Sequence, residues 1–233
     1  MTTTSRAGGE STNFLYPFID AGESDPQALL ADLAHSAQAK ARESAGLQQS
    51  TLAECAELVE RCAIEMAARF ARGGRLYSFG NGGSSTDCAT FAALFARPIT
   101  GRPLPALNLV ADQAVVTALG NDVGFELVFS RQIIAHSSDR DIAVAFSASG
   151  SSADLMSGLQ EAKRRGLMTV GFAGYTGGQM AESDAVDACF IVRSQSIHRI
   201  QESQALLSYH LWASVQRNLI PRTSVPDTTG SAR

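Results

Sequence analysis

The sequence predicts an α/β protein built on a flavodoxin-like, doubly wound sheet of five parallel strands, preceded by N-terminal helices. Two observations predict this fold class. Between residues 75 and 220, five short apolar runs alternate with amphipathic helical segments, a rhythm typical of a parallel sheet covered by helices on both faces. The apolar runs are continuous rather than alternating, as expected of strands buried on both sides. Five strands in this rhythm favour the order 2-1-3-4-5.

The individual elements follow from local patterns. Leu29, Leu30, Leu33 and Ala37 recur at helical spacing after a candidate cap at Asp25, with Pro26 at the first helical position. We expect a second N-terminal helix to start after Ser50 or Thr51 and to stop at Gly73-Gly74. The strands are expected at residues 75–80, 105–111, 141–150, 168–174 and 188–194. The helices between and after them are expected near residues 84–96, 112–119, 125–136, 152–166, 177–183 and 198–218.

The chain is expected to hold one ordered domain between two poorly ordered ends. Residues 1–25 and 221–233 are rich in Ser, Thr and Gly and have too few apolar residues to form a core. The domain at 26–220 consists of N-terminal helices at 26–73 and the α/β core at 75–220. The Ala- and Leu-rich N-terminal helices suit packing against a partner subunit as well as against the chain's own sheet.

Composition excludes several classes of function. The formal net charge is −4 and no run of Lys or Arg stands out. The sequence thus lacks the basic patch typical of proteins that bind nucleic acid directly, and no such binding is expected. No apolar run is long enough to span a membrane and no leader segment is evident, which makes the cytoplasm the expected location. The four cysteines, Cys55, Cys62, Cys88 and Cys189, form neither a CxxC motif nor a metal-ligand cluster, so a packing role is favoured.

Two polar, glycine-containing loops follow the first and third strands. They read Gly80-Asn81-Gly82-Gly83-Ser84-Ser85 and Ser147-Ala148-Ser149-Gly150-Ser151-Ser152, and each opens a helix. Either loop alone fits ordinary turn and cap residues. Both lie where such sheets bind ligands, beyond the carboxyl ends of strands at the switch point. Glycine lets backbone N–H groups approach an anion, and helix N-termini and serine hydroxyls favour phosphate.

The loops match neither of the common nucleotide motifs. "GNGGSS" lacks the GxGxxG spacing of dinucleotide-binding loops, and no Gly-Lys-Ser/Thr follows as in a Walker A loop. A compact phosphorylated metabolite therefore fits better than a nucleotide.

Four motifs, "GNGGSSTDCATFA", "GNDVGF", "AFSASGSSADL" and "RIQES", occur in order and at matching spacing. In these the chain resembles the sugar isomerase (SIS) domain family and, within it, the phosphoheptose isomerases, which interconvert sedoheptulose 7-phosphate and a heptose 7-phosphate. The resemblance covers roughly residues 29–218. It implies a homotetramer with active sites between subunits and a small-molecule phosphosugar as ligand. The substrate-binding residues that it implies are Asn81, Gly82, Gly83, Ser84, Asn121, Asp122, Ser147, Ala148, Ser149, Ser152 and Gln201, with the serines at 147, 149 and 152 on the phosphate.

The sequence departs from this family at the positions that carry the chemistry. Family isomerases hold zinc with His and Glu from the helix after the first loop and Gln and His from the last helix. The Glu also moves the substrate proton, with the His as its acid/base partner. Here the corresponding positions are Thr90, Leu94, Gln201 and Tyr209. Leucine accepts no proton and this set is no zinc site, so no metal and no cofactor are expected.

A replacement acid/base group is sought among the remaining titratable residues. His198, three residues before Gln201, takes a place where the family usually has an aspartate that faces the site, and it is the best surviving candidate. His210 is one residue away from the lost histidine position, which turns it to another side of the helix. A solvated or structurally satisfied role is favoured for both histidines, and Glu126 is expected on a surface helix.

Two functions therefore stay open. One is a phosphosugar aldose–ketose isomerase of the phosphoheptose type that uses an unusual base. The alternative is a non-catalytic SIS module, which senses a phosphosugar or serves as a protein-assembly partner. Family members that associate with the bacterial replication initiator are a precedent for the second.

Overall fold

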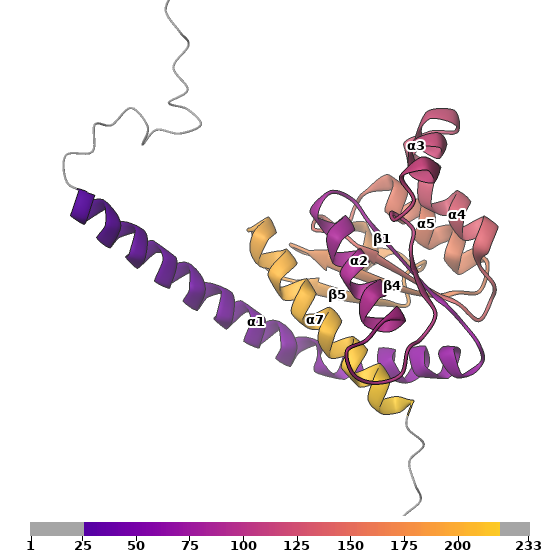
Figure 1. Ribbon diagram of the computed structural model, residues 1–233, viewed down its shortest axis with the longest axis horizontal. Helices are drawn as coiled ribbons and strands as arrows, with labels where there is room; N and C mark the ends of the chain where they lie inside the picture. The colour runs from indigo at the N-terminus through magenta and orange to yellow at the C-terminus, as the bar shows by residue number, and fades with distance from the viewer. Residues whose placement is uncertain (1–25, 220–233) are drawn as a thin grey trace, which may run out of the picture. The chain divides into compact units, whose positions relative to one another are not determined.

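The computed structural model describes residues 26–219. The expectations for residues 1–25 and 221–233 lie outside the described residues. Within them, a five-stranded, all-parallel sheet has the order β2-β1-β3-β4-β5 (Figure 1). This confirms the predicted fold class and strand order. The strands are β1 (Leu76–Gly80), β2 (Ala106–Asn108), β3 (Ile142–Phe146), β4 (Met168–Gly174) and β5 (Ala188–Val192).

The helices connect the strands in the alternation expected from the sequence. They are α1 (Pro26–Ala71), α2 (Gly83–Ala96), α3 (Gln113–Asp122), the 3₁₀ turn η2 (Phe125–Leu127), α4 (Val128–His136), α5 (Ala153–Arg164), α6 (Gly178–Glu182) and α7 (Ile197–Asn218). None of the helices within residues 26–219 combines the length and the apolar character needed to cross a membrane.

The prediction of two N-terminal helices is wrong, because α1 is one helix of 46 residues. The expected break rested on Gly46 and on Ser50 as a cap. A single glycine costs a helix only about 1 kcal/mol relative to alanine, and no proline follows it. Ser50 Oγ donates a hydrogen bond to Leu47 O, 3.0 Å away, so the hydroxyl bonds back to the helix instead of capping a new one.

The described chain falls into two compact units, residues 26–43 and residues 44–219. The first unit is the N-terminal part of α1. Its leucines, Leu29, Leu30 and Leu33, are 40%, 64% and 57% exposed. The second unit contains the sheet, the remaining helices and all of the loops discussed below.

Two clusters of buried side chains hold the second unit together, one on each face of the sheet. One face packs against the C-terminal part of α1, α2 and α7, and the other packs against α4, α5 and Met180 of α6. Figure 1 shows α2 and α7 on one side of the sheet and α4 and α5 on the other. Phe146, Phe172 and Phe190 stack across three neighbouring strands, with centroid distances of 4.4 Å and 5.0 Å. This aromatic row belongs to the core cluster on the face of the sheet that α2 and α7 cover.

Four strands are shorter than predicted, and the difference matters at β3. The strand ends at Phe146, whose backbone partner on β1 is Gly80. Ser147 Oγ then accepts a hydrogen bond from Gly150 N at 2.9 Å, which closes a turn where the sequence still suggested a strand. The two glycine- and serine-containing loops therefore leave the sheet at the same level, side by side.

Candidate functional site

The first loop is shaped by close backbone contacts at the end of β1. A Cβ atom on Gly80 would lie 2.7 Å from Ser84 O and 2.9 Å from Phe146 O, so any other residue there would displace the backbone. Gly82 has a φ of 53° and precedes the first residue of α2, a conformation that glycine adopts without strain. The glycines thus bring the start of α2 close to the end of β3.

The second loop is organised by its own serine hydroxyls. The Oγ atoms of Ser147 and Ser149 are 3.4 Å apart, and Ser149 Oγ accepts a hydrogen bond from Ser151 N at 3.3 Å. Ser152 is the N-cap of α5, but its side chain makes no capping hydrogen bond. Its hydroxyl therefore does not accept the hydrogen bond from a backbone N–H of the first helical turn that a serine N-cap usually accepts.

Side chains from neighbouring elements connect the two loops. Asn81 Nδ2 donates a hydrogen bond to Asp154 Oδ2 at 2.8 Å, which joins the first loop to the first turn of α5. Gln204 Nε2 donates to Ser147 O at 3.0 Å. The amide of Gln201 lies against Gly83, where a Cβ atom would be only 2.4 Å from its Nε2. Both loops and α7 therefore meet around one space.

That space is a cavity of 240 Å³ at the carboxyl edge of the sheet. Its volume suits a small ligand rather than a dinucleotide. The lining residues come from the two loops, the end of β3, α5 and the first turns of α7. They are Asn81, Gly83, Ser84, Phe146, Ser147, Ala148, Ser149, Ser152, Leu155, Ile197 and Gln201.

The helix starts around the cavity favour a negative charge. The N-caps of α2, α5 and α7 make no side-chain capping hydrogen bond. The same is true of α4 and α6, whereas Asp112 caps α3 by accepting from Ala114 N and Val115 N. Uncapped N–H groups and the positive end of the helix dipole attract an anion. Three such helix starts contribute residues to one cavity, which is thus suited to phosphate.

Comparison with known proteins agrees with this geometry. The model of the SIS domain matches residues 41–174. The chain belongs to the SIS-domain family. Its relatives include the phosphoheptose isomerase of Desulfovibrio desulfuricans, 43% identical over 61% of this chain and 69% of that protein. The phosphoheptose isomerase of Roseiflexus is 36% identical over 76% of this chain and 89% of that protein. The structure of phosphoheptose isomerase from Neisseria gonorrhoeae superposes with a TM-score of 0.74 at 29% identity, covering 79% of this chain and 99% of that one.

The SIS-domain cavity gathers most of the predicted site residues but not all of them. Eight of the eleven predicted substrate-binding residues line it. Gly82 is exposed and lies next to it, at the cap of α2. Asn121 and Asp122 are exposed at the end of α3, where Asn121 Nδ2 donates to Asp122 Oδ1 at 2.8 Å. His198 is exposed on α7, directly after Ile197, and does not line the cavity. Their contacts with a ligand stay predictions.

The residues at the family's zinc positions do not fit a metal ion. Thr90 Oγ1 donates to Thr86 O within α2 at 2.9 Å, Leu94 packs against the apolar core, and Tyr209 is 51% exposed. Gln201 remains as a single neutral oxygen donor. In the part of the chain that the structure describes, no three His, Cys, Asp or Glu residues come close enough to hold a metal. Zinc prefers thiolate, imidazole and carboxylate ligands, and this set offers none.

The cysteines lie in the packed interior of the described chain. Cys55, Cys62 and Cys88 are buried and Cys189 is partly buried, all as free thiols. Burial raises the pKa of Cys88 to about 12 and that of Cys189 to about 11. Thiols that stay protonated at neutral pH are poor nucleophiles and poor metal ligands.

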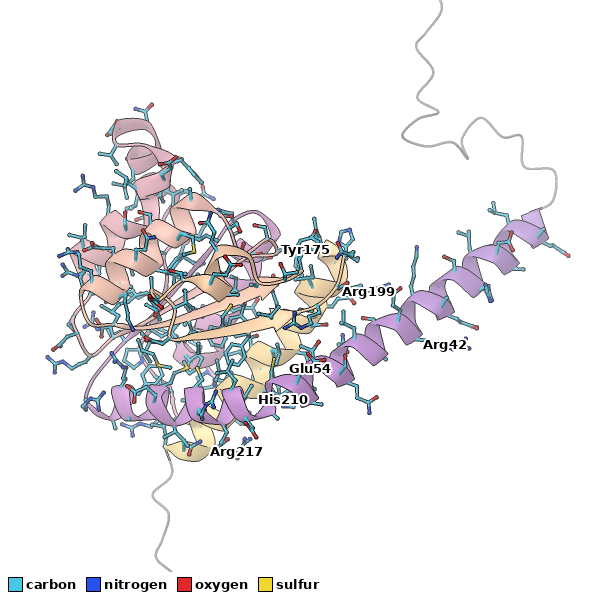
Figure 2. All side chains as sticks on the ribbon, turned by 180° about the vertical axis from the view of Figure 1, so that it is seen from behind. Arg42, Glu54, Tyr175, Arg199, His210 and Arg217 are labelled. Atoms are coloured by element: carbon cyan, nitrogen blue, oxygen red, sulfur yellow. The ribbon has the colours of Figure 1, made fainter. Side chains whose placement is uncertain are left out.

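Sequence reasoning missed a third loop, between β4 and α6. This loop packs against the second loop at residues 147–152, which is called the serine loop from here on. Gly150 and Gly177 approach so closely that a Cβ atom on Gly150 would lie 2.1 Å from Gly177 O, and Gln179 N donates to Ser151 Oγ at 3.1 Å. Tyr175 in this loop has a φ of 52°, a rare conformation for a residue with a side chain. Figure 2 shows it at the end of the α/β body where α7 begins. The glycine pair at 177–178 was the available sequence signal.

Proposed function

We propose that this SIS-domain chain binds a sugar phosphate of the phosphoheptose class in the cavity between its two glycine- and serine-containing loops, and interconverts the ketose and aldose forms. The convergence of these loops on one cavity is the observation that carries the proposal. The relatives named phosphoheptose isomerase, 36–43% identical, support the choice of substrate class.

Phosphate binding follows from the donors around the cavity. The hydroxyls of Ser149 and Ser152 and the N–H groups at the start of α5 supply hydrogen bonds that a phosphate dianion accepts. None of the described residues that line the cavity is basic, so the backbone and the helix ends provide the positive field. The amide of Gln201 borders the same cavity and is placed to bond a sugar hydroxyl or carbonyl oxygen.

The test of phosphate binding is a thermal shift with sedoheptulose 7-phosphate. We expect the wild-type chain to melt at a higher temperature with the ligand present, and the variant with Ser149→Ala and Ser152→Ala to lose that shift. Ser157→Ala, a serine on α5 outside the cavity, is the matched control and should keep it. An unchanged shift in the double variant would show that phosphate does not sit at the serine loop.

A non-catalytic role is the second candidate, and a specific observation favours it. Leu94 packs against the core and Thr90 bonds to its own helix, so neither position retains a group that transfers protons. In this reading the chain senses a phosphosugar or assists in assembling another protein. Deuterium uptake from D₂O into C5 to C8 ketose phosphates separates the two, because proton abstraction labels the sugar even when net conversion is slow.

The proposed assembly is a cytoplasmic homotetramer with sites between subunits. The exposed leucines of residues 26–43 support a role for this segment in contacts between copies. Residues from a second subunit would then complete the sugar-binding part of the cavity.

A further inference from the structure

Asp154, in the first turn of α5, is a buried carboxylate in contact with the first loop of the site. The residue is 5% exposed, and its Oδ2 accepts a hydrogen bond from Asn81 Nδ2 at 2.8 Å. Asn81 lines the cavity, whereas Asp154 lies behind it and is not part of the lining. Asp154 therefore acts on a bound ligand through the Asn81 amide rather than by contact.

The Asp154 carboxylate is held without a cation. None of the ion pairs among the described residues includes it. Its place in the first turn of α5 puts it at the positive end of the helix dipole, which favours a negative charge. A buried charge is costly unless it is hydrogen-bonded. The bond from Asn81 supplies this, and hydrogen bonds to a charged acceptor are stronger than neutral ones.

This hydrogen bond fixes the orientation of the Asn81 amide. A carboxylate has only acceptor atoms, so the amide presents its nitrogen to Asp154, and the opposite orientation would place two acceptors in contact. Because the amide is planar, the direction of Asn81 Oδ1 is fixed as well. Across residues 26–219, Oδ1 accepts no hydrogen bond and is not among the buried atoms without a partner. It is therefore an accessible acceptor on a residue that lines the cavity.

An oriented amide at this place selects the ligand group that it meets. Asn81 offers Oδ1 as an acceptor and the second hydrogen of Nδ2 as a donor. A sugar hydroxyl, which both donates and accepts, matches this pair. A phosphate dianion only accepts, so it gains nothing from Oδ1, and the negative charge of Asp154 behind the amide repels it.

We propose that Asp154 is a positioning residue, which holds the Asn81 amide with its Oδ1 toward a hydroxyl of the bound phosphosugar. The inference rests on the proposed function. It also gives the ligand a direction, with the phosphate at the serine loop and a hydroxyl-bearing carbon at Asn81. Since α5 begins directly after Ser152, Asp154 ties the amide to the same helix start that faces the phosphate.

The test compares two phosphate monoesters in Asp154→Leu, which keeps a branched side chain but accepts no hydrogen bond. Sedoheptulose 7-phosphate carries hydroxyls, and ethyl phosphate carries none. By isothermal titration calorimetry, we expect the Kd for sedoheptulose 7-phosphate to rise about 2- to 13-fold, the usual worth of one hydrogen bond. The Kd for ethyl phosphate, measured by competition, should stay the same or fall, because a nearby negative charge is removed. General damage to the cavity would weaken both ligands.

Two further variants separate positioning from stability. In an Asn81→Ala background, Asp154→Leu should change the Kd for sedoheptulose 7-phosphate by less than about twofold, because the amide that it positions is absent. Asp141→Asn alters a buried carboxylate just before β3, at the opposite edge of the sheet, which accepts from Arg75 N at 2.8 Å and Ser138 N at 2.7 Å. It should lower the free energy of unfolding but leave the ratio of the two Kd values unchanged.

Each other outcome has a defined meaning. An unchanged Kd for sedoheptulose 7-phosphate in Asp154→Leu overturns the inference, as does an equal weakening of both ligands or an undiminished effect in the Asn81→Ala background. Wild-type protein that binds sedoheptulose 7-phosphate no more tightly than ethyl phosphate also overturns it, while leaving phosphate binding intact. Wild-type protein that binds neither overturns the proposed function, and this inference with it. Should Asp154→Leu not fold, Asp154→Ala is measured in the same way and judged by the same criteria.

Discussion

Replacing Gly83 by alanine should impair ligand binding without weakening the fold. A Cβ atom at this position would lie 2.4 Å from Gln201 Nε2, 3.2 Å from Gln201 Cδ and 3.3 Å from Gln201 Oε1, and these three nearest atoms all belong to one side chain. The end of a glutamine side chain moves readily, so the clash is relieved by displacing the amide from the cavity. Gly83 is exposed and its φ is not positive, so alanine fits the helix and should stabilise it by about 0.4–1 kcal/mol.

The expected loss of affinity follows from one displaced hydrogen bond. A neutral hydrogen bond contributes about 0.5–1.5 kcal/mol, so the Kd for sedoheptulose 7-phosphate should rise about 2- to 13-fold. Isothermal titration calorimetry gives the Kd, and urea unfolding gives the free energy of unfolding. We expect weaker binding together with unchanged or higher stability, a combination that general damage to the fold does not produce.

A double-mutant cycle with Gln201→Ala shows whether the effect passes through the amide. If it does, Gly83→Ala should cost little further affinity in the Gln201→Ala background, because the displaced group is already absent. Two results would refute the reasoning. One is an equal loss of affinity in both backgrounds, and the other is a clear drop in the free energy of unfolding for Gly83→Ala alone.

Two further predictions concern the stability of the sheet. Phe172→Ala should lower the free energy of unfolding by about 3–5 kcal/mol in a urea titration, since Phe172 is fully buried between Phe146 and Phe190; a loss below 1 kcal/mol would contradict the packing. Burial acts to raise the pKa of Asp187, but hydrogen bonds from Lys163 and from the backbone and hydroxyl of Thr169 outweigh it and lower the pKa. Stability from Asp187 is thus present above the unfolded pKa of about 3.9 and is lost as the pH falls through the folded value. Acid titration monitored by circular dichroism should show a smaller loss for Asp187→Asn than for wild type.

The sheet could be predicted from sequence because its pattern is redundant. Each strand is a continuous apolar run, each is followed by an amphipathic segment, and the order of five such units leaves few topologies. The continuity of α1 could not be predicted in the same way. Gly46 and Ser50 are weak local signals for a break, and the helical residues on both sides outweigh them.

The candidate site was predictable where backbone geometry defines it and unpredictable where single side chains do. Glycines and serines after the first and third strands indicated the loops, since few residue types permit such turns. Asp154 gave no such signal, because a carboxylate in an amphipathic helix usually faces solvent. Only the structure shows that Asp154 accepts a hydrogen bond from Asn81.

Binding and chemistry depend on different parts of this fold, so one can change without the other. The proposed phosphate-binding region consists of backbone N–H groups, helix ends and hydroxyls whose positions follow from the ends of β1 and β3. Proton transfer needs one titratable side chain at the right turn of a helix. Thr90 and Leu94 remove the family's groups from α2 without disturbing the loops, because both side chains are accommodated by the helix or the core. Without another group that transfers protons, this independence leaves a chain that binds a phosphosugar and performs no chemistry on it.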